Sequence, residues 1–301
     1  MKAIQFDRYG GPDVLGLVDI AAPHAGPGEV RISVRAAGVN PSDWKRRAGL
    51  YRDFEDVSFP AGVGVEAAGV VDEVGEGVAG VAVGDAVFGF GNGTVAQCAV
   101  LTHWAPKPDL MPFDVAAGVP VVFETASRAL DELGLGDGRT LLVSGGAGGI
   151  GTAVIQLARL RGLSVIATAS AAKQDYVREL GAVATTYGPG LAERVRLLAP
   201  DGVDGALDVA GSGVLPELIG IVGEARRVLS VADLSAESYG AKFSLGPPQD
   251  PVGALLQAAR LWSEGRFRLH IDRTFPLAET AEAHAVSSAG HVTGKLVIAI
   301  G

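Results

Sequence analysis

The first hundred residues show the short alternation of apolar and polar side chains that is typical of half-buried β-strands. Residues 30–36 (Val-Arg-Ile-Ser-Val-Arg-Ala) alternate almost strictly. Residues 68–73 and 86–90 are further strand candidates, and glycine turns at Gly75-Glu76-Gly77 and Gly84-Asp85 separate them. Short strands with turns at this spacing predict a small β-barrel or β-sandwich.

From about residue 127 the pattern changes to short apolar runs that alternate with helical spacing. Residues 140–144 and 164–168 are predicted strands, and residues 150–160 and 172–180 are predicted helices, the second ending at Gly181. Strand and helix continue to alternate up to about residue 231. This order predicts an α/β domain with a doubly wound parallel sheet that helices cover on both faces.

The C-terminal part returns to strand periodicity after one further helix. We expect a helix over 252–262, a strand over 269–275, an Ala-rich helix over 277–287 and a strand over 295–300. A barrel without closing strands would leave an open sheet edge, so the tail is assigned to the first domain. The expected organisation is a β-rich domain of residues 1–121, completed by 266–301, and an α/β domain of residues 122–265.

Composition and charge exclude several classes of protein. The chain has 301 residues, of which 48% are hydrophobic and 20% charged, so it can bury a large core. Its net charge of −9 argues against nucleic-acid binding. The single cysteine, Cys98, excludes an internal disulfide framework and favours a cytoplasmic protein. Residues 140–158 carry no charge, but their central glycines favour strand, turn and helix over a membrane span.

The strongest chemical signal is the glycine loop Gly146-Ala147-Gly148-Gly149-Ile150-Gly151, which matches Gly-x-Gly-x-x-Gly. A predicted strand precedes the loop and a predicted helix follows it, which is the context of a dinucleotide-binding turn. Glycines there allow a pyrophosphate to approach the free N–H groups at the helix N-terminus. Alternatively, the glycines only let the helix and the strand pack closely.

The residues after the second strand of this domain indicate which cofactor binds. NAD-selective sites place an acidic residue there for the ribose hydroxyls, but residues 167–173 (Ala-Thr-Ala-Ser-Ala-Ala-Lys) contain none. The Ser170 hydroxyl and the Lys173 ammonium suit a phosphate instead, which favours NADPH over NADH. Alternatively, Ser170 is an ordinary helix N-cap and Lys173 is a solvated residue.

Several segments together resemble one family over nearly the full chain. They are Ala37-Gly38-Val39-Asn40-Pro41-Ser42-Asp43, Gly64-Val65-Glu66-Ala67-Ala68-Gly69-Val70-Val71, Val74-Gly75 to Gly84-Asp85, the glycine loop and Gly294-Lys295-Leu296-Val297. In order and spacing they resemble the zinc-independent quinone oxidoreductases of the medium-chain dehydrogenase/reductase superfamily. The resemblance implies a GroES-like catalytic domain, a Rossmann domain inserted before the C-terminal strands, a cleft between the two, and a homodimer.

Zinc is not expected at the site. Zinc-using relatives place Cys where Asn40 stands and His where Val65 stands, and the four-cysteine structural lobe is missing as well. Valine cannot bind zinc and asparagine binds it poorly, so the usual set of about three protein ligands cannot form.

The resemblance also assigns roles to single residues. It implies that Asn40 and Tyr51 face the nicotinamide, where an amide and a phenol can donate hydrogen bonds to an emerging oxyanion. It implies that Thr125 lies next to the nicotinamide ring and Tyr187 near the adenosine phosphate. Lys295 is also expected to contact the cofactor.

Other interpretations of these segments stay open. Asn40 could have no role other than capping the turn before Pro41, and Tyr51 could lie on a loop. Asp43 could belong to the site or to that turn, Glu66 is interpreted as a structural remnant of a zinc environment, and Arg128 could reach a phosphate or a partner helix. Four aromatic residues could line a pocket or belong to the core: Phe54, Phe59, Phe88 and Phe90.

The expected function is NADPH-dependent reduction of a small-molecule quinone or an α,β-unsaturated carbonyl compound by direct hydride transfer. Electron-poor acceptors of this kind need no Lewis acid, because only the emerging oxyanion must be stabilised. One alternative is an enoyl thioester reductase of a biosynthetic pathway. Another is an NADPH-binding redox sensor or structural protein with little turnover.

Overall fold

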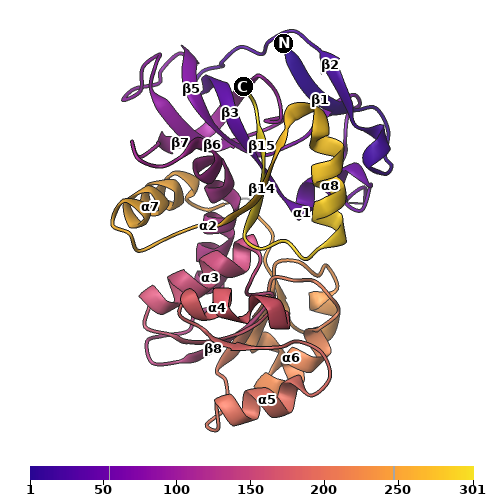
Figure 1. Cartoon of the computed structure of the whole chain (residues 1–301), viewed down its shortest axis with the longest axis vertical. Coiled ribbons are helices and arrows are strands. Elements are labelled where there is room, and N and C mark those ends of the chain that lie inside the picture. The colour runs from indigo at the N-terminus through magenta and orange to yellow at the C-terminus, as the bar shows by residue number, and fades with distance from the viewer. Residues whose placement is uncertain (54, 247) are drawn as a thin grey trace. The chain divides into compact units, whose positions relative to one another are not determined.

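The computed structural model describes residues 1–53, 55–246 and 248–301, and its chain divides into two compact units (Figure 1). The first unit comprises Met1–Val121 and Pro251–Gly301, and the second comprises Val122–Asp250. Residues 251–265 were expected in the second domain. In the structure their helix, α7 (Pro251–Ser263), packs against strand β7 (Cys98–Pro106) and groups with the first unit.

The first unit is rich in β-structure. A six-stranded sheet has the order β14 (Ile271–Pro276), β15 (Lys295–Ala299), β3 (Val30–Val39), β5 (Glu66–Val74), β6 (Ala86–Gly91), β7. Strand β7 also pairs with β3, so that β3, β5, β6 and β7 close on themselves as a small barrel. A three-stranded sheet adds β2 (Gly16–Asp19), β1 (Lys2–Phe6) and β4 (Ala61–Gly62).

The alternation of apolar and polar residues determines which side chains of β3 face the core. Val30, Ile32 and Val34 are buried in the barrel core, while Arg31 and Arg35 point outward. Strand β15 pairs antiparallel with the end of β3, so residues near the C-terminus are part of the same sheet. Short helices complete the unit: η1 (Pro12–Val14), α1 (Pro41–Arg47), η5 (Leu277–Glu279) and α8 (Thr280–Ala289).

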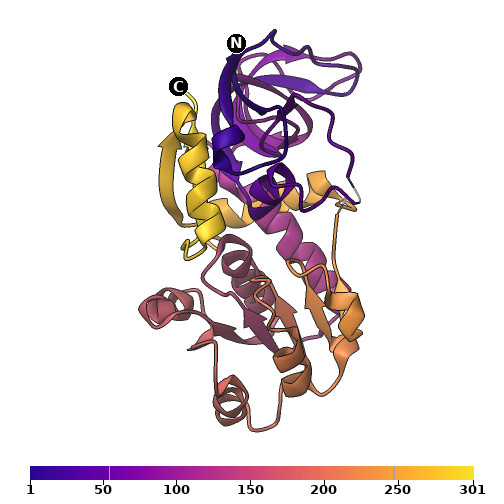
Figure 2. The same cartoon turned by 90° about the vertical axis from the view of Figure 1, so that its right-hand side faces the viewer.

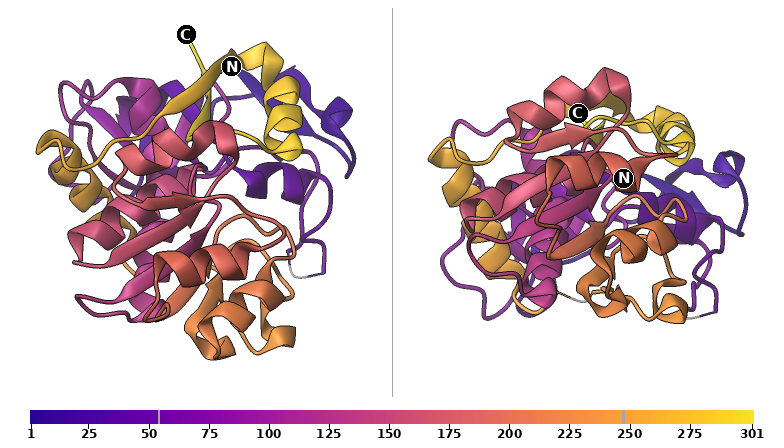
Figure 3. Two further views of the ribbon diagram at one scale, coloured as in Figure 1. Left: turned by 60° about the horizontal axis from the view of Figure 1, so that its bottom comes forward. Right: turned by 90° about the horizontal axis from the view of Figure 1, so that it is seen from below.

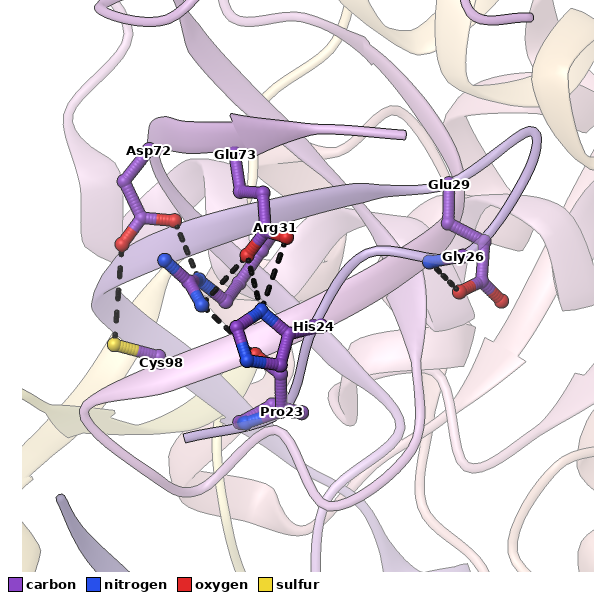
Figure 4. Close-up of polar contacts among 8 residues, drawn as sticks. All are labelled: Pro23, His24, Gly26, Glu29, Arg31, Asp72, Glu73 and Cys98. Atoms are coloured by element: carbon purple, nitrogen blue, oxygen red, sulfur yellow. Dashed lines mark hydrogen bonds and ion pairs between the residues drawn. The ribbon is translucent and has the colours of Figure 1, made fainter. Parts of the chain in front are cut away.

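The pairing of β3 with β5 is irregular at Arg31, and the irregularity has a clear use. The register shifts between Arg31, opposite Glu73, and Ile32, opposite Val71, so Asp72 has no partner of its own. The bulge brings two carboxylates to one guanidinium: Arg31 lies 2.8 Å from Asp72 and 2.6 Å from Glu73 (Figure 4). The nearby Cys98 thiol has a raised pKa because of burial and the charge of Asp72, so it is not an activated nucleophile.

The second unit is a parallel α/β domain. Its six-stranded sheet has the order β10 (Val183–Thr185), β9 (Ser164–Thr168), β8 (Thr140–Ser144), β11 (Gly205–Asp208), β12 (Val228–Ser230), β13 (Lys242–Phe243). All neighbouring pairs are parallel. The chain turns back between β8 and β11, as expected for a doubly wound sheet.

Helices pack against this sheet as the alternation predicts. Helix α3 (Gly149–Leu160) packs on β8 and β9. Helices α5 (Leu191–Leu198) and α6 (Leu215–Val222) share a core with Leu142 of β8 and Ile166 of β9. Figure 3 shows helices of this unit beside its sheet. The remaining elements are η2 (Ala171–Lys173), α4 (Gln174–Glu179), η3 (Ala225–Arg227) and η4 (Ala236–Tyr239). A Rossmann-type sheet and a β-rich GroES-like domain confirm the predicted fold class.

Helix α2 (Phe113–Leu133) was not predicted from the sequence (Figure 2). Pro120 stands inside it, and an internal proline normally argues against a helix because it removes an N–H group. Of the four phenylalanines considered for a pocket, Phe88 is fully buried and Phe59 contacts the rings of Phe6 and Tyr9 edge-on. Phe54 lies outside the described residues.

Candidate active site

The glycine loop connects β8 to α3 and is held by the end of β9. The backbone N–H of Gly146 donates to the carbonyl oxygen of Thr168 at 2.8 Å, and that of Gly145 donates to the Thr168 hydroxyl at 3.1 Å. Gly145 has a φ of +91°, which favours glycine. The turn is therefore fixed by the neighbouring strand.

Two of its glycines are required by close packing, and a third faces open space. A Cβ on Gly151 would lie 2.2 Å from the carbonyl oxygen of Gly145, and one on Gly146 would lie 2.8 Å from the Cβ of Ala167. A Cβ on Gly148 would meet only the Gly145 oxygen at 3.8 Å. Gly148 is the N-cap of α3, and no side chain caps this helix. A phosphate group could therefore approach these N–H groups.

The residues assigned to cofactor choice follow the ends of the neighbouring strands. Ser170 comes two residues after β9, and Tyr187 comes two residues after β10. Because β8, β9 and β10 are parallel, their carboxyl ends share one edge of the sheet with the glycine loop. Ser170 precedes η2, its hydroxyl makes no capping hydrogen bond, and Lys173 ends η2. Tyr187 is 55% exposed.

Thr125 lies on α2 and is 8% exposed. Its hydroxyl lies 3.5 Å from a carboxylate oxygen of Glu124. Glu124 also forms a buried ion pair with Arg128 at 2.8 Å, and the Arg128 guanidinium donates to the Ser244 hydroxyl. Arg128, whose role the sequence left open, is thus occupied by side chains of the second unit itself.

Asp208 is a polar residue of this edge that the sequence did not single out. It ends β11 and is fully buried. One carboxylate oxygen accepts from the N–H groups of Ala210 and Gly211, each at 3.1 Å, and the other accepts from the Ser230 hydroxyl at 2.8 Å. Asp208 therefore fixes the loop that leaves the middle of the sheet. An acid directly after an apolar run was the available signal.

In the first unit, four polar side chains come together; we call Asn40, Asp43, Glu66 and Lys295 the Glu66 cluster. All are nearly buried, with exposed fractions of 3%, 6%, 0% and 3%. The Lys295 ammonium lies 2.7 Å from one Glu66 carboxylate oxygen and also donates to the amide oxygen of Asn40. The Asn40 amide nitrogen donates to that same Glu66 oxygen at 2.7 Å. Charges on both sides therefore fix the orientation of the Asn40 amide.

The backbone around Glu66 is adapted to its carboxylate. The second carboxylate oxygen accepts from the N–H of Val121 at 2.7 Å, directly after Pro120 in α2. A Cβ on Gly38 would lie 2.3 Å from the first oxygen, so only glycine fits beneath it. Glu66 thus has a partner for each oxygen, as a buried charge requires.

Asp43 is the member of the cluster whose charge acts on Tyr51. Asp43 is the third residue of α1, and its carboxylate accepts from the N–H of the N-cap residue Asn40 at 2.7 Å. Burial raises the pKa of Asp43 to about 7, although that hydrogen bond and the charge of Lys295 oppose the rise. Burial, together with the charges of Asp43 and Glu55, raises the pKa of Tyr51. The Tyr51 phenol therefore keeps its proton, and the charge of Asp43 contributes to this.

The structure brings some predicted site residues together in ways the sequence did not indicate. Asn40 was predicted, but its contact with Lys295 was not, since Lys295 was expected at the cofactor. The available signal was a pair of opposite charges among apolar residues: Glu66 lies just before the predicted strand 68–73, and Lys295 begins the predicted strand 295–300. Such charges are almost never buried alone, so the two could have been paired.

The described residues offer neither a metal-binding group nor a membrane-spanning helix. Within residues 1–53, 55–246 and 248–301, no group of three His, Cys, Asp or Glu side chains could hold a metal ion. In the same described part of the chain, every helix is too short or too polar to cross a membrane.

Comparison with known proteins agrees with this fold. Residues 26–109 match the alcohol dehydrogenase GroES-like domain, and residues 180–298 match a family described as zinc-binding dehydrogenase. The chain is 33% identical to an NADPH-dependent alkenal/one oxidoreductase of Arabidopsis thaliana, covering 99% of this chain and 79% of that protein. It is also 34% identical, over 93% of its length, to the spectinabilin polyketide synthase protein NorB of Streptomyces orinoci, of which it spans only 13%.

Solved structures give the same result. The quinone oxidoreductase of Coxiella burnetii is 31% identical, with a TM-score of 0.86 over 100% of this chain and 99% of that one. The mycobacterial protein Rv1454c, solved in complex with NADPH, is 27% identical, with a TM-score of 0.87 over 99% and 100% of the two chains. A GroES-like domain joined to a Rossmann-type sheet defines a dehydrogenase/reductase. The chain belongs to the quinone oxidoreductase family of the medium-chain dehydrogenase/reductase superfamily.

Proposed function

We propose that this protein is an NADPH-dependent reductase of quinones or α,β-unsaturated carbonyl compounds that works without a metal ion. The observation that carries the proposal is the glycine loop, whose close-packed Gly146 and Gly151 leave Gly148 and the start of α3 open to a pyrophosphate. Relatives named as an alkenal/one oxidoreductase and a quinone oxidoreductase support the substrate class.

We propose a place for each part of NADPH in the second unit. Gly146, Gly148, Gly149, Ile150 and Gly151 would hold the pyrophosphate at the N-terminus of α3. In the same proposal, Ser170 and Lys173 hold the 2′-phosphate, Tyr187 lies at the adenosine and Thr125 at the nicotinamide. No acidic residue lies between β9 and Lys173, where it would bind the ribose hydroxyls and favour NADH.

The bound cofactor supplies a hydride, and the protein's own groups handle the charge and the proton. Tyr51 is proposed to donate a hydrogen bond to the substrate oxygen as negative charge develops there. Asn40 carries two amide hydrogens. One is donated to Glu66, and the other is proposed to form a hydrogen bond to the substrate oxygen. Asp43, whose pKa is raised to about 7, is suited to return a proton to Tyr51. Zinc has no place here, because Val65 cannot bind it and the Asn40 amide is already engaged.

Location and assembly form the finer part of the proposal. A cytoplasmic location is supported by the single cysteine. A homodimer is expected from the family resemblance. Size-exclusion chromatography with light scattering would test the dimer directly.

The test is NADPH oxidation by the purified protein with a benzoquinone, phenanthrenequinone, a 2-alkenal and an enoyl thioester, with NADH as the control donor. Turnover of a quinone or the alkenal with NADPH supports the proposal. Turnover of the thioester alone would make the protein a biosynthetic enoyl reductase. Tight NADPH binding without reduction of any acceptor would make it a sensor or structural protein.

The cofactor preference has its own pair of variants. Lys173→Met is expected to weaken NADPH binding about tenfold, about 1.4 kcal/mol, and to leave NADH binding unchanged. Lys242→Met is the matched control, because Lys242 lies on β13 at the opposite end of the same sheet. Equal losses for both cofactors would refute the phosphate role of Lys173.

A further inference from the structure

Among the described residues of the first unit, three side chains have buried polar atoms without a partner; two are on α1 and one is on α8. Among the described residues, the atoms are Nε1 of Trp44, Nε and Nη1 of Arg47, and Nδ1 of His284. Trp44 and Arg47 are three residues apart on α1, which puts them on one face of that helix. Helix α8, which carries His284, packs against α1 and η1 (Figure 1). Buried polar groups in folded proteins are nearly always hydrogen-bonded, so this group needs an explanation.

Arg47 is the most unusual of the three. It is 3% exposed, and its Nε and Nη1 atoms have no hydrogen-bond partner among the residues that the structure describes. Its guanidinium cannot lose its charge near neutral pH. The acid whose charge acts on it is Asp13 of η1, which is exposed. Among the described residues, this buried positive charge therefore has no buried counter-charge.

The neighbouring groups cannot supply that counter-charge. His284 is 1% exposed, and burial, followed by the charge of Arg47, lowers its pKa to about 4. It is therefore neutral at pH 7 and can offer an N–H group at Nδ1. The Trp44 indole nitrogen is a donor only. The charge of Arg47 acts on His284, and Trp44 on the same face of α1 as Arg47 adds a further hydrogen-bond donor.

We infer that η1, α1 and α8 enclose a binding site for a small monovalent anion, with chloride as its occupant. A halide accepts hydrogen bonds from several N–H groups at once and neutralises the guanidinium, which a water molecule cannot do. The proposed anion must be small, because Arg47 and His284 are nearly inaccessible and helices α1 and α8 are in contact. Since α1 begins after Asn40 and carries Asp43, the anion would hold in place the helix that supports the Glu66 cluster.

Thermal unfolding tests this site in the whole protein. Chloride replaces gluconate at constant ionic strength, from about 1 mM to about 300 mM, and the midpoint temperature is measured. We expect it to rise with the logarithm of chloride concentration above the dissociation constant, as binding to the folded state alone requires. In Arg47→Met this rise should be lost. In Arg46→Met, which removes a guanidinium of the same helix that is already paired with Glu55 at 2.6 Å, it should persist.

A wild-type midpoint that does not depend on chloride would overturn the inference, and so would an equal dependence in Arg47→Met. If Arg47→Met does not fold, crystals of the wild-type protein soaked in sodium bromide decide the matter. An anomalous bromide peak within hydrogen-bonding distance of Arg47 is the expected result. A water molecule there without anomalous signal would show that the site is only hydrated. Neither measurement depends on NADPH or on a reducible substrate, so the inference stands or fails separately from the proposed function.

Discussion

The glycine loop of the second unit and the Glu66 cluster of the first unit both manage charge, but they are built in opposite ways. The loop lies within residues 145–151 and depends on the absence of side chains. A Cβ on Gly151 would lie only 2.2 Å from the carbonyl oxygen of Gly145. The cluster joins Asn40, Glu66 and Lys295, which lie on different elements, and it works because each charge has a partner.

The difference explains which site is recognisable from a sequence. A site made of backbone N–H groups requires glycines at fixed spacing, because only they allow the turn and the close contacts. A site made of side chains from distant segments requires no such spacing. Its contact between Asn40 and Lys295 spans 255 residues, and only folding brings them together. Three substitutions would test this comparison.

Gly151→Ala should have the largest effect. A methyl group there would lie 2.2 Å from the Gly145 oxygen and 2.8 Å from Gly146, so the turn must open. We expect NADPH affinity to fall by about a thousandfold or more, about 4 kcal/mol, in a fluorescence titration. Gly220→Ala is the control, because its Cβ would meet open space within α6. It should bind NADPH normally, and alanine in a helix should add about 0.5–1 kcal/mol to the free energy of unfolding. Unchanged NADPH affinity in Gly151→Ala would contradict the assigned geometry of the loop.

Lys295→Met should come next. It leaves the Glu66 carboxylate buried without its cation, which should lower the free energy of unfolding by about 3–5 kcal/mol in urea denaturation. Lys2→Met is the matched control, since the Lys2–Asp19 pair is exposed and such pairs contribute little to stability.

The same variant separates two roles for Lys295. The structure gives it Glu66 and Asn40 as partners, whereas the family resemblance implies cofactor contact. A large loss of stability with NADPH affinity unchanged would favour the structural role. Unchanged stability with a large loss of NADPH affinity would favour the cofactor role and remove Lys295 from the charge balance of the cluster.

Asp43→Asn should have the smallest effect, visible as a change with pH. The pKa of Asp43 is about 7 in the folded protein, against 3.8 for an ordinary Asp. Between these values the folded state holds the proton more tightly, so the wild-type free energy of unfolding should fall as pH rises from about 4 to about 7. Asparagine can still accept from the Asn40 N–H and does not titrate. The variant should therefore gain stability relative to wild type, on the order of 1–3 kcal/mol, over that pH range.

His284 acts with the opposite sign, so a pH profile of the wild-type protein alone would be ambiguous. Its pKa is lowered from 6.5 to about 4, which makes the folded protein less stable as pH falls through that range. Only the difference between wild type and Asp43→Asn isolates Asp43, because His284 is common to both. A difference that does not change with pH would show that Asp43 is not perturbed by burial.

Much of the fold could be predicted from the pattern of residues. The alternation in residues 30–36 gave a strand with Val30, Ile32 and Val34 inside, and α3 covers nearly the predicted 150–160. Helix α2 was not predicted. Pro120 argues against a helix unless the N–H groups around it have other hydrogen-bond partners. Here the N–H of Val121 donates to the Glu66 carboxylate, a contact across 55 residues that no local pattern reveals.

The parallel α/β domain, the β-rich domain and the glycine loop follow from the amino-acid sequence alone, because these depend on local periodicity and on backbone conformations that glycine allows. The folded structure is needed to show that Lys295 pairs with Glu66, that the charge of Asp43 acts on Tyr51, and that Arg47 is buried. The physical reason is that the energy of a charge depends on its surroundings in space. Desolvation and pairing arise from residues far apart in the chain, and the same letter can therefore describe a solvated side chain or a buried ion.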